Sequence, residues 1–165
     1  MARRPDIIDV WLFRVRDGGA DVLMLHRARE RVLANLWQGV SGRVEPDERV
    51  VDAAWREVRE ETGYSAADVE TAYHLDYVSE FLWEPLDATI SSVYFAFRVP
   101  GDREPVLSHE HDRWEWLPIE DAIRRVVWPG YRVSLEHLRD NLLDPERAEW
   151  FVLDARGTRG GPSAG

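Results

Sequence analysis

The chain contains no cysteine and no lysine, and these two absences exclude several kinds of chemistry. Without cysteine there can be no disulfide, no zinc–thiolate site and no thiol nucleophile. All 21 basic residues are arginines, so the chain has no lysine for a Schiff base or for a lysine-dependent phosphate-binding loop. Thiol and amine nucleophiles are therefore ruled out before any motif is considered.

Long hydrophobic runs and excess positive charge are missing as well. The apolar runs have the length of strands, and the Arg3-Arg4-Pro5 start lacks the apolar core of a signal peptide, so we expect a cytoplasmic protein that does not enter a membrane. A formal net charge of -10 argues against broad nucleic-acid binding, which requires an electropositive surface. A polyanionic substrate would need bound metal ions to neutralise it.

What the sequence does contain is the pattern of one α/β domain with a mixed sheet. At 165 residues the chain is long enough for one core. Asp17-Gly18-Gly19 is typical of a hairpin turn, and residues 148–154 are either a last strand or an extended cover. We expect a single domain over residues 1–155 and a flexible Gly/Ser/Pro-rich tail over 156–165. The periodicity predicts strands at 7–13, 21–26, 36–42, 71–83, 91–99 and 113–117, and helices at 49–62, 118–127 and 132–143.

The most informative segment is GRVEPDERVVDAAWREVREETGY, residues 42–64, which holds four arginines and seven acidic residues. An apolar stripe at helical spacing predicts an amphipathic helix over 49–62. Asp47 is a candidate N-cap and Gly63 a candidate left-handed C-cap, while Asp52 should face solvent. The stripe consists of Val50, Ala53, Ala54 and Val58.

Three carboxylates, those of Glu57, Glu60 and Glu61, fall on one face of this helix within about one turn. Like charges at such spacing repel each other, and a hard cation such as Mg²⁺ or Mn²⁺ would resolve the conflict. Helix geometry alone leaves an alternative open, because Arg56 and Glu60 stand four residues apart and could belong to a solvated charged face.

The full spacing of the segment decides between these readings. Gly42, Glu48, Arg56-Glu57-Val58, Glu60-Glu61 and Gly63-Tyr64 match the pattern G-x5-E-x7-R-E-U-x-E-E-x-G-U at every fixed residue. Only Tyr64 stands where an aliphatic residue is usual. This pattern is the Nudix box, and the chain resembles the Nudix hydrolases.

The resemblance implies an α/β/α sandwich around a mixed sheet, and hydrolysis of a nucleoside diphosphate linked to another group, with a divalent metal. It implies that Glu57, Glu60, Glu61 and the carbonyl of Ser41 are metal ligands. Arg56 and Glu48 would orient the glutamates. Mg²⁺ is the expected cofactor, with Mn²⁺ as an alternative.

A further acidic residue is expected from the loop before a late strand, where SHEHDRWEW offers Glu110. The resemblance implies that Glu110 is an extra metal ligand or the general base, although it could also be one of several surface acids. Glu61 and Glu110 both remain candidates for the residue that deprotonates water. The flanking His109 and His111 form an H-x-H pair that could bind a transition metal, but two loop histidines are more often polar surface residues, and we interpret them as such.

Outside the box, the chain is most similar to bacterial dihydroneopterin triphosphate or deoxynucleoside triphosphate pyrophosphohydrolases. The similar segments are VLMLHR (22–27), LWQGVSGRVE (36–45), EHDRWEWL (110–117) and WPGYR (128–132). They imply cleavage to a monophosphate and pyrophosphate. Arg27 is a candidate phosphate clamp, or else a surface residue. Trp37, Trp128 and Tyr131 are candidates for stacking on a base or pterin ring, or else parts of the core.

Several alternatives stay open. The substrate could be a dinucleoside polyphosphate, ADP-ribose or a nucleotide sugar. A noncatalytic nucleotide-binding module is disfavoured because no box glutamate is missing, and RNA cap removal is disfavoured by the acidic charge. Many relatives are dimers, so the resemblance allows a homodimer.

Overall fold

The computed structural model describes residues 2–154 and 156–162. Its elements are β1 (Ile7–Arg16), β2 (Gly19–Arg27), β3 (Trp37–Gln38), β4 (Val40–Arg43), α1 (Val50–Thr62), β5 (Thr71–Trp83), β6 (Ala88–Arg98), β7 (His111–Pro118), α2 (Ile119–Arg125), α3 (Pro129–His137), α4 (Pro145–Ala148) and β8 (Val152–Leu153). A π-type turn, Leu138–Leu142, extends α3, and short 3-10 turns lie at Ala66–Asp68, Glu84–Leu86 and Glu149–Phe151.

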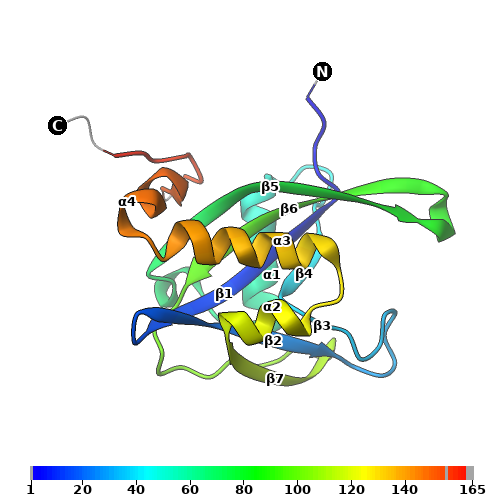
Figure 1. The fold of residues 1–165 in the computed structure, drawn as a ribbon. Coiled ribbons are helices and arrows are strands. Elements are labelled where there is room, and N and C mark those ends of the chain that lie inside the picture. The colour runs from blue at the N-terminus through cyan, green and yellow to red at the C-terminus, as the bar shows by residue number, and fades with distance from the viewer. Residues whose placement is uncertain (1, 155, 163–165) are drawn as a thin grey trace.

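One mixed sheet forms the middle layer. Its main path runs β3-β2-β1-β6-β5-β8, with β4 paired to β1 and β7 paired to β2. The β1 and β6 strands are parallel, whereas the other paired strands are antiparallel. Figure 1 shows α2 and α3 in front of this sheet and α1 behind it. The predicted α/β/α sandwich around a mixed sheet is confirmed.

Alternation along β1 builds two cores, one on each face of the sheet. Ile8 and Val10 face the side of α1, where Ala53, Ala54 and Val58 are buried. Trp11 and Phe13 face the other side and pack with residues of α2 and α3. The central strands therefore carry buried side chains on both faces, as strands between two helical layers should.

Most sequence-based expectations for single elements are confirmed. The β1–β2 hairpin turns at Asp17 and Gly18, both with positive φ (46° and 78°), which is the geometry of a type I′ turn. Gly63 ends α1 with φ 71° and donates its N–H to the carbonyl of Arg59 at 3.0 Å. Asp52 is exposed, as expected.

Other expectations were wrong at element ends. The N-cap of α1 is Arg49 and has no side-chain cap, so Asp47 does not cap the helix. The stretch 36–42 is two strands, because Trp37 and Gln38 pair with β2 whereas Val40–Arg43 pairs with β1. Between them, a Cβ at Gly39 would come within 2.7 Å of the Val10 carbonyl oxygen. The helix expected from Arg132 already begins at Pro129, whose fixed φ suits a first helical position.

The C-terminal segment reaches the far edge of the sheet. Val152 and Leu153 pair with β5, and Gly160 donates its N–H to the carbonyl of Val152 at 2.7 Å. Residues 156–162 thus have backbone contacts with the strand before them, and the flexibility expected of the tail stays a prediction. Residues 163–165 of that tail lie outside the described residues. None of the helices described is both long and apolar enough to cross a membrane.

Candidate active site

The segment that matches the Nudix box forms a strand, a loop and a helix that together carry the candidate site. Strand β4 ends at Arg43, and α1 begins at Val50. Gly42 lies directly against the side chain of Glu57: a Cβ added at Gly42 would come within 2.0 Å of the Glu57 Cδ atom. Only glycine leaves this space, so the backbone of β4 and the carboxylate of α1 can approach each other.

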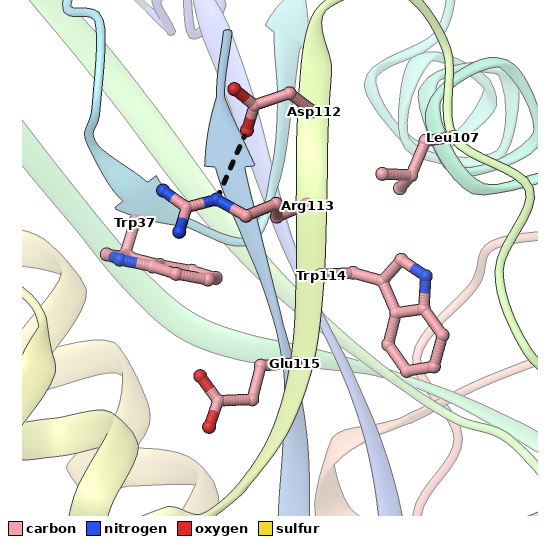
Figure 2. A pocket seen from close by; sticks show the side chains of 6 residues that line it. All are labelled: Trp37, Leu107, Asp112, Arg113, Trp114 and Glu115. Carbon is pink, nitrogen blue, oxygen red and sulfur yellow. Dashed lines mark ion pairs between the residues drawn. The ribbon is translucent and has the colours of Figure 1, made fainter.

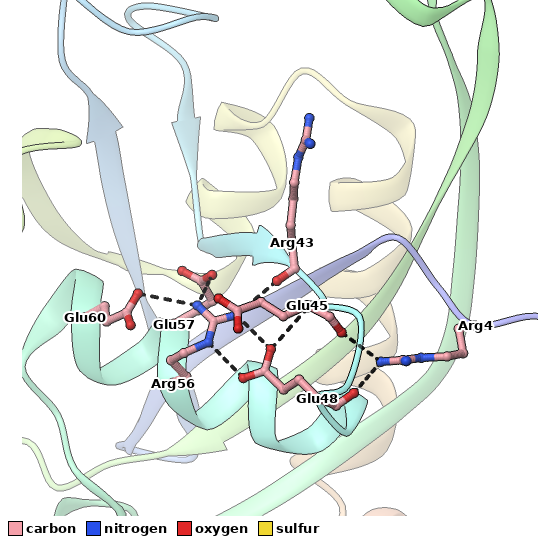
Figure 3. A network of polar contacts seen from close by, with 7 residues as sticks. All are labelled: Arg4, Arg43, Glu45, Glu48, Arg56, Glu57 and Glu60. Atoms are coloured by element: carbon pink, nitrogen blue, oxygen red, sulfur yellow. Dashed lines mark hydrogen bonds and ion pairs between the residues drawn. The ribbon is translucent and has the colours of Figure 1, made fainter.

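Arg56 organises the outer part of the site (Figure 3). Its Nε and Nη2 atoms donate to the two carboxylate oxygens of Glu48 at 2.8 and 2.9 Å, which is a bidentate pair. Its Nη1 lies 2.5 Å from Glu57 Oε1 and 3.4 Å from Glu60 Oε2. Hydrogen bonding to Arg56 lowers the pKa of Glu48. This arrangement supports the orienting roles expected for Arg56 and Glu48.

Glu61 has a different environment on the inner side of the same helix. It is 2% exposed, and neither of its carboxylate oxygens has a hydrogen-bond partner among the residues that the structure describes. Burial, followed by the negative charges of Glu57 and Glu110, raises the pKa of Glu61 well above its usual value. A buried carboxylate without a partner is costly, so this position is not explained by stability.

Glu110 approaches the same group from the loop before β7. Its negative charge contributes to the raised pKa values of both Glu57 and Glu61, although burial is the larger cause in each case. The backbone carbonyl of Glu110 accepts a hydrogen bond from Ala28 N–H at 3.0 Å, which fixes the loop beside the end of β2. The structure therefore brings Glu110 toward the box glutamates.

Ser41 and Arg27 lie near the inner part of the site. Ser41 pairs with Asp9 across the β1–β4 ladder, and the proximity of its backbone lowers the pKa of Glu61, against the larger effect of burial. The positive charge of Arg27 acts in the same direction on the pKa of Glu61. Arg27 is half-buried, and its Nε donates to the carbonyl of Val32 at 2.8 Å.

The three aromatic candidates are spread over different environments. Trp128 is 44% exposed at the start of α3. Tyr131 is 8% exposed and packs edge-on against Trp11, so stacking on a substrate would require its ring to leave the core. Trp37 lies beside the guanidinium groups of Arg113 and Arg125, 5.7 and 5.1 Å from its ring centroid.

A shallow hollow surrounds the edge strand β7 near Trp37 (Figure 2). Trp37 and Arg113 lie on one side of the strand in this view, and Leu107 and Trp114 on the other. None of the box glutamates lines it. Its lining residues are Trp37, Leu107, Asp112, Arg113, Trp114 and Glu115.

Two buried polar residues of the site were missed or misread from the sequence. His111, interpreted as a surface residue, is 4% exposed, and its Nδ1 lies 3.9 Å from Glu61 Oε2. Burial lowers the pKa of His111 to about 4, so the ring is neutral at pH 7. Asp9 is 4% exposed and accepts a hydrogen bond from Ser92, and burial raises its pKa to about 6. A lone acid in the apolar run IIDVWLF was the available signal for Asp9.

The carboxylate oxygens of the site are suitable ligands for a hard divalent cation, although the side chains do not enclose one in the observed arrangement. Within residues 2–154 and 156–162, no three acidic or histidine side chains are gathered closely enough to hold an ion. Glu57 and Glu60 turn toward Arg56 instead (Figure 3). The two unpartnered oxygens of Glu61, however, are hard donors of the kind that Mg²⁺ prefers.

A carboxylate-rich helix that follows a strand with glycine at its penultimate position, in an α/β/α sandwich, is the arrangement expected of a Nudix hydrolase. The family comparison agrees: the model described as NUDIX domain matches residues 5–138. The chain therefore belongs to the NUDIX family, and the predicted class is confirmed.

The names of three similar proteins state three different activities. An octanoyltransferase from Myxococcus xanthus is 32% identical over 130 residues, 78% of this chain, but the chain spans only 35% of that protein's length. The Escherichia coli CTP pyrophosphohydrolase is 32% identical over 70% of this chain and 78% of its own. An RNA pyrophosphohydrolase from Halorhodospira halophila is 30% identical over 87% and 82%, respectively.

Among solved structures, the E. coli dihydroneopterin triphosphate pyrophosphohydrolase is similar to this chain with a TM-score of 0.71. The two are 27% identical, and the alignment covers 84% of this chain and 97% of that one.

Proposed function

We propose that this protein is a Mg²⁺-dependent pyrophosphohydrolase that converts a nucleoside, deoxynucleoside or dihydroneopterin triphosphate into a monophosphate and pyrophosphate. In this reaction the oxygen of water bonds to phosphorus and a bridging P–O bond breaks, so that pyrophosphate leaves. The names of the E. coli CTP and dihydroneopterin triphosphate enzymes support this substrate class.

The observation that carries the proposal is the environment of Glu61. Its carboxylate is buried, has no hydrogen-bond partner within residues 2–154 and 156–162, and lies near the charges of Glu57 and Glu110. Stability alone would select against such a group, because burying an unpaired charge is strongly unfavourable. A divalent cation would satisfy these oxygens and neutralise the surrounding negative charge.

In this proposal the candidate residues have different roles in the reaction. Glu57, Glu60, Glu61, Glu110 and the carbonyl of Ser41 would hold the metal, which when bound would act as a Lewis acid on the phosphate oxygens. Arg56 would keep Glu57 and Glu60 close to the site, since it contacts both carboxylates. Arg27 would bind a phosphate, and Trp37, Trp128 or Tyr131 would contact the base or pterin. Either Glu61 or Glu110 would accept the proton of water.

The test is a substrate panel with purified protein and Mg²⁺ or Mn²⁺. The panel contains CTP, other nucleoside and deoxynucleoside triphosphates, dihydroneopterin triphosphate, diadenosine tetraphosphate, ADP-ribose and 5′-triphosphorylated RNA, and products are separated by anion-exchange chromatography. Monophosphate plus pyrophosphate from a free triphosphate supports the proposal. A wide preference for the dinucleotide or ADP-ribose contradicts the substrate class, and tight binding without turnover indicates a noncatalytic module.

The 5′ end of RNA is a second candidate substrate. The H. halophila relative is named an RNA pyrophosphohydrolase, and its similarity to this chain covers most of its length. In addition, Arg27, Arg29 and Arg31 lie in or beside the loop between β2 and β3, and none of them forms an ion pair within the part of the chain described. Faster release of pyrophosphate from triphosphorylated RNA than from CTP would favour this candidate.

A further inference from the structure

The loop between β4 and α1, residues 44–49, carries Glu48 and is held from two sides. On the helix side, Arg56 Nη2 donates to the carbonyl oxygen of Arg43 at 3.0 Å, and its guanidinium binds the Glu48 carboxylate. Within the loop, Glu48 Oε2 accepts from the N–H of Glu45 at 3.3 Å. These contacts fix the loop against α1.

The second side is held by Arg4, which lies far from the box in the sequence (Figure 3). Its guanidinium donates to three backbone carbonyl oxygens of the loop, those of Glu45 (3.1 Å), Pro46 and Glu48. A planar guanidinium can serve several acceptors at once in a fixed geometry, which a lysine ammonium does less well. The single guanidinium of Arg4 thus binds three backbone carbonyl oxygens of the loop.

The segment that carries Arg4 is itself anchored to the sheet. The carbonyl of Asp6 accepts from Val44 N–H at 3.0 Å, and Asp6 N–H donates to the carbonyl of Ser91 at 3.0 Å. Strand β1 begins at Ile7, so Arg4 stands three residues before a buried strand. The position of its guanidinium is therefore tied to the centre of the fold.

We propose that Arg4 is a positioning residue: it holds the loop at residues 44–49 in place and so keeps the hydrogen-bonded series Glu48–Arg56–Glu57 in the geometry required for metal binding. The contacts form one continuous path: Arg4 holds the Glu48 backbone, the Glu48 side chain holds Arg56, and Arg56 contacts Glu57. Arg4 touches neither substrate nor metal in this assignment, which rests on the proposed metal-dependent function.

The test compares Arg4→Met with Arg3→Met in the full chain. The two changes remove the same charge from adjacent residues, but the Arg3 side chain is 86% exposed and, among the described residues, forms an ion pair only with Glu80, at 3.3 Å. Methionine keeps an apolar stem and removes the donors. Backbone amide hydrogen exchange over residues 44–50 measures how firmly the loop is held, without any substrate or metal. Calorimetric titration with Mg²⁺ measures the affinity of the metal site without turnover.

We expect faster exchange over 44–50 and about 10-fold weaker Mg²⁺ binding in Arg4→Met, as for other residues that orient metal ligands indirectly, and no change in Arg3→Met. With substrate, the Mg²⁺ concentration for half-maximal rate should rise while the rate at saturating Mg²⁺ changes little. Equal behaviour of the two variants would overturn the inference, as would a lower melting temperature with unchanged Mg²⁺ affinity. Failure of the proposed function would instead show as an inactive wild type.

Discussion

Two carboxylates of the box, Glu48 and Glu61, have opposite environments. Glu48 is bound by both nitrogens of the Arg56 fork, and its pKa is lowered. Glu61 is buried without a partner, and its pKa is raised. Two acids on neighbouring parts of one motif thus have different surroundings: the paired one holds the loop to the helix, whereas the unpaired one has the environment that our proposal assigns to a metal ligand.

The largest effect is expected from Glu61→Gln, which removes the reserved charge. Turnover should fall by about 10³-fold or more, because a metal typically contributes several kcal/mol to the transition state. The metal-free protein should nevertheless melt at a higher temperature, since a buried charge without a partner is removed. Steady-state kinetics and thermal unfolding of the same sample check both results.

Asp52→Asn is the matched control, because Asp52 lies on the same helix and is exposed. It should change neither turnover nor melting temperature appreciably. A Glu61→Gln variant that is as active as this control would remove Glu61 from the metal site. An active control with an inactive Glu60→Gln variant would extend the ligand set to Glu60, as predicted.

Gly42→Ala should have the next largest effect, because the new Cβ would overlap the Glu57 side chain. Displacing that carboxylate should lower turnover by about 100-fold, which is typical of a small misplacement of a reacting group. Gly19→Ala is the control, since its added Cβ meets only the Arg16 carbonyl oxygen at 3.7 Å. If both alanine variants retain full turnover, the close approach of β4 to Glu57 has no catalytic importance.

Arg56→Met tests the paired side of the comparison. It removes the charged partner of Glu48, leaving only the N–H of Glu45 among the described residues, and should destabilise the fold by about 2 kcal/mol, below the range for fully buried pairs because both side chains are partly exposed. Urea unfolding measures this change. In the double variant Arg56→Met, Glu48→Gln the loss should be smaller, because the uncompensated charge is gone. Equal losses in the single and double variants would show that Glu48 and Arg56 do not act as a pair.

The smallest effect concerns His74, a buried group without a partner that lies outside the site. In the described part of the chain, neither of its ring nitrogens has a hydrogen-bond partner, and burial lowers its pKa. The unfolded chain therefore binds the proton more tightly, so stability should decrease as the pH falls below about 6.5 toward the folded pKa.

His74→Phe should flatten this pH dependence and leave turnover unchanged. Urea unfolding at pH 7.5 and 5.5 compares the variant with the wild type. An identical loss of stability in both proteins would assign the pH dependence to other groups. A large change in turnover would show that unpaired buried groups outside the box also serve the reaction.

Local signals were enough to predict much of this architecture from the sequence. The helical stripe placed α1 within one residue of its observed start, Val50, and Gly63 marked its end because its left-handed backbone favours glycine. The box spacing selected the glutamates that our proposal assigns to the site. The hairpin turn followed directly from Asp17-Gly18.

What the sequence did not predict depends on tertiary contacts. Asp47 has cap chemistry, yet the helix begins later, beside the engaged Glu48 side chain. The burial of His111 follows from its position between Gln38 and Glu61, which come from β3 and α1. The rotation of Glu57 and Glu60 toward Arg56 likewise depends on a side-chain arrangement that spacing does not specify.

The most direct test of the reserved role of Glu61 is the melting temperature as a function of Mg²⁺ concentration, without substrate, for the wild type and Glu61→Gln. If Mg²⁺ binds the folded wild type through Glu61, its melting temperature should rise with Mg²⁺ by linkage, while the variant should start higher and rise much less. Parallel curves with equal rises in both proteins would contradict the assignment of Glu61 as a metal ligand.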